Sequence, residues 1–392
     1  MNDVVIVAAA RTPVGRFGGV FKNAGALDLT IPVMQALLER SGIEAAIIDD
    51  VIWGCNYQKT FRENNLARVA AVKAGFPVTV PGITIHRNCT SSMSAVQMAY
   101  YQIKCGEADV IMAGGTDSMS NAQYTIEKMR HGARLGHAEI RDSMWDSLTD
   151  LGIGPAMGIT AENLARKFQI SREAQDELAY TSHQRAVAAI DEGRFASQIV
   201  PVEVREKKTA KHIDTDEHPR RDISMEGLAR LKPSFLEDGT VTAGNASGIN
   251  DGAAGLLVMS AEKAQALGLP VMARVCGTAT TGVDPDIMGI GPVTAIPRAL
   301  EKSGTPFSDI ELFELNEAFA AQYLACELEL GLNRDITNVN GSGVSLGHPV
   351  GATGARITTT LLYEMQHRGL KKGAAALCAG GGMGTALVLE KP

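Results

Sequence analysis

The sequence predicts an α/β protein made of two related halves with a segment inserted between them. Short apolar runs rich in Val and Ile alternate with longer amphipathic stretches along the 392 residues, as buried strands alternate with helices. Two segments, DVIMAGGTDSM (109–119) and AALCAGGGMGT (375–385), each resemble an apolar strand followed by a Gly-Gly turn, which indicates a duplication. Residues 119–245 are rich in charge and show little strand character before residue 199, which indicates an insertion.

The first third of the chain predicts four strands and a helix. Residues 4–9 (VVIVAA) are apolar throughout and predict a fully buried strand, and similar short runs predict strands at 51–54, 82–85 and 109–113. A helix is expected after Cys89, ending at Gly106. Its apolar residues fall on one helical face: Met93, Val96, Tyr100 and Ile103.

The last third repeats this alternation. The pattern predicts strands at 271–279, 310–315 and 374–378, with helices at 318–330 and from a Gly-rich turn to Gly369. The inserted segment predicts helices at 160–168 and 171–190 and a strand at 199–204.

Composition excludes several classes of protein. The net charge is −7 and no Lys/Arg block is present, so nucleic acid is not expected as a partner. The six cysteines are scattered, without a C-x-x-C pair or a His pair at ligand spacing, so no metal site is expected. No run reaches the ~18 apolar residues of a membrane span, and the first residues lack a basic signal region. We therefore expect a cytoplasmic protein with free thiols.

Cys89, in NCTSSMSAV (88–96), is the first candidate for chemistry. It lies where a turn gives way to a helix, and the free N–H groups of a helix start favour the thiolate over the thiol. Thr90 and Ser91 are also good residues for a helix start. The alternative interpretation is therefore a capped helix with an incidental core cysteine.

His348, in GHPVGATGAR (347–356), lies between glycines and a proline, on a rigid turn where it could exchange a proton with a nucleophile. A purely structural hydrogen-bonding role is the alternative. The preceding GSGVSLG has the wrong spacing for a dinucleotide-binding loop, and no acidic residue follows at the expected distance.

Two further candidates follow apolar runs. Cys378, in CAGGGMG (378–384), ends a predicted strand, and the glycine N–H groups after it could form an oxyanion hole; the alternative is a buried cysteine before a tight turn. Asn316, in NEAFA (316–320), could hold a water molecule or polarise a carbonyl, or it could be a helix N-cap.

These four segments, in this order, resemble the thiolase family. The resemblance covers the chain from VVIVAAARTPVGRFGG to CAGGGMGTALVLE and includes MGITAEN (157–163) and AGNASGINDGAA (243–254). It implies two βαβαβαββ halves in a layered α/β/α/β/α core with an inserted loop domain. The implied parts are residues 1–118 with about 246–268, the loop domain 119–245 that covers the site and binds coenzyme A, and residues 269–392.

The resemblance also implies roles. Cys89 would take the acyl group, and His348 would accept the Cys89 proton. Cys378 would remove the α-proton of a second acyl-CoA, or return it in the reverse direction. Asn316 would hold the water that forms one oxyanion hole with His348, and the N–H groups of Cys89 and Gly380 would form the other.

For coenzyme A, the resemblance points to five residues: Ser247 near the pantetheine arm, Arg220 near the adenosine phosphate, Met157 and Phe319 along the acyl channel, and Ala243. The alternative for Arg220 is a solvated charge beside Arg221. This chain departs from the usual family pattern at three positions, with His86 for Asn, Ser92 for Gly, and Ala156 where short-chain biosynthetic members often carry His. All three are expected near the nucleophile or the acyl channel, where they bear on substrate choice.

The expected activity is that of an acetyl-CoA C-acyltransferase in fatty acid metabolism. It would interconvert two acetyl-CoA with acetoacetyl-CoA and CoA, need no cofactor or membrane, and form a homodimer or homotetramer. A longer, branched or aromatic 3-oxoacyl-CoA substrate is one alternative. A non-catalytic acyl-CoA-binding subunit of a complex is another. A decarboxylating condensing enzyme is disfavoured, because that class typically has His or Asn at the position of Cys378.

Overall fold

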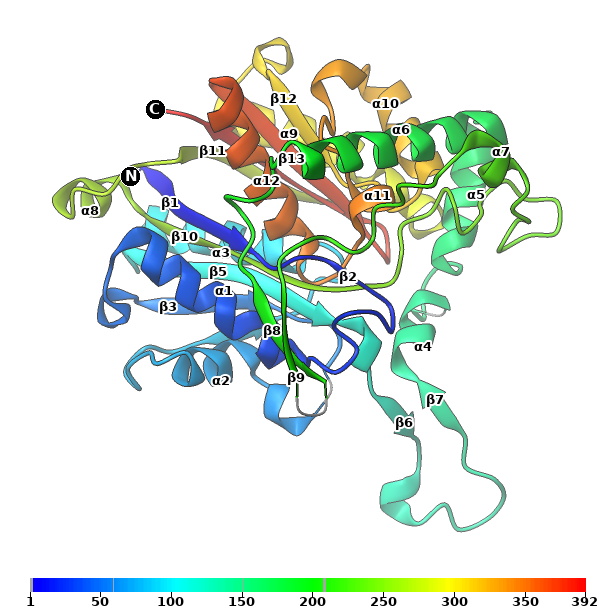
Figure 1. Cartoon of the computed structure of the whole chain (residues 1–392), viewed down its shortest axis with the longest axis horizontal. Coiled ribbons are helices and arrows are strands. Elements are labelled where there is room, and N and C mark those ends of the chain that lie inside the picture. The colour runs from blue at the N-terminus through cyan, green and yellow to red at the C-terminus, as the bar shows by residue number, and fades with distance from the viewer. Residues whose placement is uncertain (1–2, 59, 150, 207–208) are drawn as a thin grey trace.

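The computed structural model describes residues 3–58, 60–149, 151–206 and 209–392 (Figure 1). Within them, ten strands form one sheet in the order β12-β13-β14-β11-β1-β10-β5-β3-β4, with β2 beside β10. Their bounds are β1 Val4–Arg11, β2 Gly15–Arg16, β3 Asp50–Gly54, β4 Ile83–Ile85, β5 Val110–Ser118, β10 Asn250–Ser260, β11 Ala273–Gly282, β12 Leu312–Leu315, β13 Lys372–Ala379 and β14 Met383–Glu390.

The sheet consists of two halves with the same pairing pattern. In the first, β1 pairs antiparallel with β10, β10 antiparallel with β5, and β5 parallel with β3. In the second, β11, β14, β13 and β12 repeat the order antiparallel, antiparallel, parallel. The halves join through two residue pairs only, Val5 with Arg274 and Ile6 with Ala273. The topology therefore supports the predicted duplication.

Helices cover the sheet in three layers. Helices α3 and α12 lie between the half-sheets, α1 and α2 cover the outer face of the first half, and α5, α9 and α10 cover that of the second. The helix bounds are α1 Ala26–Ser41, α2 Leu66–Lys73, α3 Ser91–Cys105, α4 Ser143–Thr149, α5 Met157–Lys167, α6 Arg172–Asp191, α7 Met225–Ala229, α8 Ala261–Ala266, α9 Gly291–Ser303, α10 Ala320–Leu330, α11 Gly343–Leu346 and α12 Thr353–Arg368.

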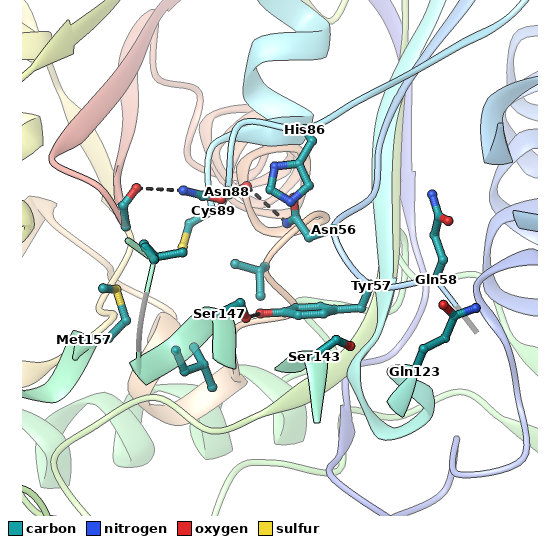
Figure 2. A pocket seen from close by; sticks show the side chains of 14 residues that line it. Asn56, Tyr57, Gln58, His86, Asn88, Cys89, Gln123, Ser143, Ser147 and Met157 are labelled. Atoms are coloured by element: carbon teal, nitrogen blue, oxygen red, sulfur yellow. Dashed lines mark hydrogen bonds between the residues drawn. The ribbon is translucent and has the colours of Figure 1, made fainter. Parts of the chain in front are cut away.

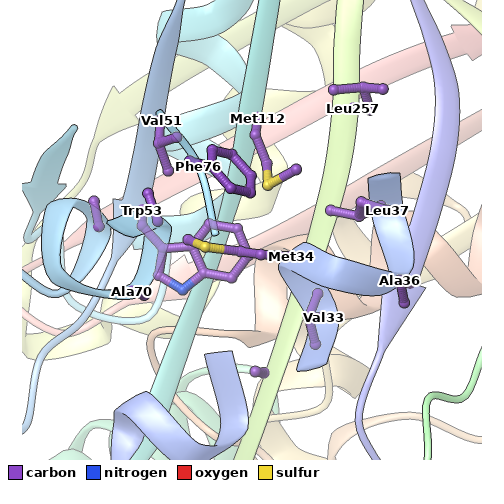
Figure 3. Close-up of a cluster of buried hydrophobic side chains, with 14 of the residues drawn as sticks. Val33, Met34, Ala36, Leu37, Val51, Trp53, Ala70, Phe76, Met112 and Leu257 are labelled. Carbon is purple, nitrogen blue, oxygen red and sulfur yellow. The ribbon is translucent and has the colours of Figure 1, made fainter. Parts of the chain in front are cut away.

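Apolar packing on both faces of the strands holds the layers together. On the outer face of the first half, Trp53 of β3 packs with Met34 and Leu37 of α1 (Figure 3). The buried Trp53 indole donates to Thr116 Oγ1 at 2.9 Å, so its one polar atom is satisfied. Each fully buried Leu, Met or Phe in this cluster contributes about 1.5–3 kcal/mol to stability.

The predicted Gly-Gly turn after residue 113 is wrong. Strand β5 continues through Gly114 and Gly115 to Ser118. Close approach explains the two glycines: a Cβ at Gly114 would lie 2.4 Å from the Ala254 carbonyl oxygen, and a Cβ at Gly115 would lie 2.1 Å from the Gly351 oxygen. By contrast, Gly381 and Gly382 have φ of +85° and +82° and do form the turn between β13 and β14.

Two strand pairs in the inserted segment also differ from expectation. Strands β6 Tyr124–Ile126 and β7 Ile140–Asp142 form a ribbon that projects from the body (Figure 1), and the sequence does not predict it. Both are exposed on both faces, so they carry no alternating pattern. The strand expected at 199–204 begins at β8 Val202–Glu206 and pairs with β9 Thr209–Ile213.

Candidate active site

Three turns meet at the N-terminal ends of the central helices. The first, residues 86–90, carries Cys89 and leads into α3; the second, residues 347–352, carries His348 and leads into α12; the third, residues 380–382, follows Cys378 at the end of β13. Asn88 Nδ2 of the first turn donates to the Gly380 oxygen of the third at 2.8 Å. Cys89 also packs in a cluster with Val350 of the second turn.

The Cys89 thiol is the nucleophile candidate on the pocket wall, where it is partly exposed. Burial raises its pKa to about 11, although the backbone N–H groups of Gly380 and of Cys89 itself act in the opposite direction. The N–H groups at the helix start do favour the thiolate, as predicted, but they are not the largest influence on the pKa of Cys89. Loss of water around the sulfur outweighs the local N–H groups, and Thr90, not Cys89, is the residue at the helix N-cap.

His348 has the arrangement that a general base requires. Its Nδ1 lies 2.7 Å from Thr353 Oγ1, whose hydroxyl donates to the Pro349 oxygen at 2.8 Å. Because that hydroxyl hydrogen is used, Nδ1 must carry the proton that joins the two groups. Nε2 is then an acceptor, and it is buried with no hydrogen-bond partner among the residues that the structure describes. Burial also lowers the His348 pKa to about 3, so the ring is neutral.

Cys378 and Asn316 lie below the pocket surface. Cys378 is fully buried against Met288 and Ala318, and burial raises its pKa well above the usual value, with the nearby Cys89 adding to the shift. Asn316 follows β12 and is also buried. Its Oδ1 lies 3.4 Å from Arg356 Nη2, and its Nδ2 has no protein partner. Asn316 is not the N-cap of α10, because Phe319 occupies that position.

A pocket of about 270 Å³ opens beside Cys89 (Figure 2). Its lining joins all three turns to residues 56–58 and to the inserted segment: Asn56, Tyr57, Gln58, His86, Asn88, Cys89, Gln123, Ser143, Ser147, Leu148, Leu151, Met157, Val350 and Gly380. The buried side chains of His348, Cys378 and Asn316 are not part of this lining.

Four of the five predicted coenzyme A residues fall in two places, and Ala243 lies in neither. Met157 lines the pocket, and with Phe319 it packs against Cys378. Ser247 is close to these residues, since its N–H donates to the Ala318 oxygen at 3.0 Å. Arg220 is exposed in a separate hollow of about 520 Å³, lined by Arg16, Phe17, His218, Arg220, Asp222, Gly248 and Ile249. Ala243 is exposed in a turn and lines neither hollow.

The three departures from the family pattern have different surroundings. His86 lines the pocket, as expected. Ser92 does not: it is fully buried, and its Oγ accepts the Ala355 N–H of α12 at 2.9 Å. Ala156 is the N-cap residue of α5 and lies outside the lining. Ser92 lies in the first turn of α3 after Cys89, and Ala156 directly precedes the lining residue Met157, but of the three only His86 lines the pocket.

Sequence reasoning missed Asp117, a fully buried carboxylate in β5. It accepts hydrogen bonds from Asn56 and Tyr57 of the pocket wall and from Gly351 of the second turn. The available signal was an acidic residue within an apolar strand, since aspartate is seldom fully buried.

Two absences apply to the part of the chain that the structure describes. It contains no group of three or more His, Cys, Asp or Glu side chains that could hold a metal ion. None of its helices is both long and apolar enough to cross a membrane.

The pKa of Cys89 predicts how its reactivity depends on pH. With a neutral imidazole nearby and a thiol pKa near 11, the thiolate fraction should rise about tenfold for each pH unit between pH 6.5 and 9.5. The rate of inactivation by iodoacetamide, with modification of Cys89 verified by mass spectrometry, should rise in parallel. A rate that levels off near pH 7 would instead indicate a thiolate–imidazolium pair.

Comparison with known proteins assigns the family. Residues 4–262 match the thiolase N-terminal domain and residues 269–391 the thiolase C-terminal domain. An acetyl-CoA acetyltransferase of Pseudomonas aeruginosa is 50% identical over the full length of both chains. The crystal structure of the Bacillus anthracis acetyl-CoA acetyltransferase is 52% identical, with a TM-score of 0.98 and coverage of 100% and 99%. Human mitochondrial 3-ketoacyl-CoA thiolase in complex with CoA is 42% identical, with a TM-score of 0.96 and coverage of 100% and 98%. The chain therefore belongs to the thiolase family of acyltransferases.

Proposed function

We propose that the chain interconverts two acetyl-CoA with acetoacetyl-CoA and free CoA through an acyl-enzyme on Cys89. The observation that carries this proposal is that three turns meet around one pocket, with the Cys89 thiol on its wall. In the second turn, His348 Nε2 is buried and has no hydrogen-bond partner among the described residues. The names of the relatives agree with this substrate, and the human relative with bound CoA supports coenzyme A as the carrier.

The first half-reaction transfers the acetyl group. His348 Nε2 takes the Cys89 proton, and the sulfur attacks the thioester carbonyl carbon of acetyl-CoA. The N–H groups of Cys89 and Gly380 stabilise the developing oxyanion. The C–S bond to coenzyme A then breaks, and His348 returns the proton to the leaving thiolate.

The second half-reaction forms the carbon–carbon bond. The Cys378 thiolate removes an α-proton from a second acetyl-CoA, and His348 with a water on Asn316 stabilises the enolate oxygen. The enolate carbon attacks the acetyl carbonyl, the bond to Cys89 sulfur breaks, and the released Cys89 thiolate takes up the proton that Cys378 removed, which restores the starting form of both cysteines. In the thiolysis direction, Cys378 gives a proton to the leaving enolate. Burial favours the protonated thiol, which is the form that thiolysis needs.

The pocket favours a short acyl group over the longer, branched or aromatic alternatives. At about 270 Å³ its volume lies just below the usual range of roughly 300–1,000 Å³ for small-molecule sites. In a thiolysis assay with 3-oxoacyl-CoAs from four carbons upward, including branched and aromatic chains, we expect the highest kcat/KM for acetoacetyl-CoA. A higher value for an eight-carbon substrate would contradict the short-chain assignment. Binding of acyl-CoA without turnover of any substrate would support the non-catalytic subunit.

Substitution of each of the two cysteines should block a different step of the reaction. Cys89→Ala should leave no site for label from [¹⁴C]acetyl-CoA, so no acyl-enzyme should be seen by mass spectrometry. Cys378→Ala should still be acylated but should not exchange the α-protons of acetyl-CoA with solvent deuterium. Each variant is the control for the other. Labelling of Cys89→Ala, or normal exchange by Cys378→Ala, would remove that thiol from its assigned role.

We further propose that the chain acts as a cytoplasmic homodimer or homotetramer in fatty acid metabolism. The projecting β6–β7 ribbon and the adjacent α4 support assembly, because they carry large exposed apolar side chains: Tyr124, Leu135, Ile140 and Trp145. Sedimentation equilibrium of the purified chain should give a mass of two or four copies. A single-copy mass at micromolar concentration would contradict assembly.

A further inference from the structure

Asp117 is a buried carboxylate that accepts four hydrogen bonds from N–H groups around the active site, and the Cys55 thiol is a further donor, with its Sγ 3.7 Å from Asp117 Oδ1. Its Oδ1 accepts the backbone N–H groups of Asn56 and Tyr57 at 2.8 and 3.0 Å. Its Oδ2 accepts the Gly351 N–H at 2.5 Å and Asn56 Nδ2 at 3.1 Å. Among the described residues it forms no ion pair, so these donors are what stabilises the charge.

The bonds of Asp117 continue through Asn56 to the nucleophile turn. Asn56 Nδ2 donates to the Asn88 oxygen at 3.2 Å as well as to Asp117, so the two amide hydrogens have separate acceptors. Asn88 Nδ2 then donates to the Gly380 oxygen at 2.8 Å. Figure 2 shows both bonds of Asn88. One chain of hydrogen bonds therefore runs from Gly351 through Asp117, Asn56 and Asn88 to Gly380.

This series of hydrogen bonds includes one residue from each of the three turns. Gly351 belongs to the turn of His348, Asn88 to the turn of Cys89, and Gly380 to the turn that follows Cys378. Asn88 is also one of the few non-glycine residues with positive φ, at +46°. Such a conformation costs of order 1 kcal/mol or more and persists only where surrounding contacts hold it. Its carbonyl and side chain supply those contacts.

The surroundings of Asp117 are suited to a carboxylate, although burial of the charged group is unfavourable. Burial raises the Asp117 pKa to about 6, and its charge also raises the pKa of Cys89. An apolar residue would avoid both effects but would leave four N–H groups without a partner. Gly351 is fitted to this acceptor, since a Cβ there would lie 2.8 Å from Asp117 Oδ2.

We propose that Asp117 is a positioning residue that fixes the three catalytic turns relative to one another, so that both half-reactions depend on it. It does not line the pocket and has no part in bond making. The inference rests on the roles proposed above for Cys89, His348 and Cys378.

The direct test is Asp117→Asn, which keeps the shape but turns one acceptor into a donor facing N–H groups. Since a displacement of about 1 Å can reduce a rate ~100-fold, kcat for thiolysis should fall by about that factor, with KM for acetoacetyl-CoA changed less than about threefold. Acylation of Cys89 and α-proton exchange should both slow. Loss of only one half-reaction would overturn the proposal.

Asp251→Asn is the matched control. Asp251 is a buried aspartate on the neighbouring strand, with its pKa also raised to about 6, but it accepts Ser120 N and Oγ at 2.8 and 2.5 Å, and none of its hydrogen bonds among the described residues involves the three turns. The Asp251→Asn variant should have a lowered melting temperature, as should Asp117→Asn. Its kcat for thiolysis should stay within about threefold of the parent value. Equal losses of kcat in both variants would reduce Asp117 to a stabilising residue.

Hydrogen–deuterium exchange separates this inference from the proposed activity. Asp117→Asn should speed exchange in peptides covering 86–91, 347–353 and 380–383, and Asp251→Asn should not. This measurement decides the matter even if the parent chain shows no thiolysis, which would itself contradict the proposed function. If Asp117→Asn fails to fold, Asn56→Ala can be used instead. It removes the hydrogen bonds of the Asn56 side chain to Asp117 and Asn88 and should speed exchange in the turn that carries Cys89. Unchanged exchange in the variant that folds would overturn the inference.

Discussion

The close packing of α3 against α12 at their N-terminal ends is the constraint on which the active site depends. A Cβ at Gly354, in the first turn of α12, would lie 2.5 Å from the Met93 backbone nitrogen in α3. The Ser92 hydroxyl accepts the Ala355 N–H, as an N-cap side chain would, and the N-cap residue Ala352 has no such group. Because both helices begin here, the turns that precede them must lie side by side between the half-sheets.

Burial between two sheets then determines the electrostatics. The thiols of Cys89 and Cys378 and the imidazole of His348 all have pKa values shifted toward their neutral forms, with loss of water as the largest cause. In the mechanism that we propose, charge that develops during the reaction is met by fixed dipoles, such as the N–H of Gly380 and the amide of Asn316. In a dry site such dipoles act more strongly than they do in water.

The sequence alone predicted the structural features that depend on the pattern of neighbouring residues. The buried strands, the helices that end at Gly106 and Gly369, and the position of Asn316 after β12 all follow from neighbouring residues. It failed where distant residues decide. Gly115 resembles a turn residue until the Gly351 carbonyl is placed against it. The N–H groups near Cys89 are local, whereas the burial that outweighs them comes from elements far apart in the chain.

Asp117 illustrates, for the active site, the same limit of prediction from sequence. Its donors lie 60 to 62 residues before it and 234 residues after it, so no motif could contain them. Asn56, Asn88 and Gly380 both hold the turns and line the pocket, whereas other residues have only one of these positions. Ser92 and Asp117 are buried and hold the turns, whereas His86 and Met157 line the pocket. A substitution at position 92 therefore acts on the packing of α3 and α12, and one at position 86 changes a surface that faces the pocket.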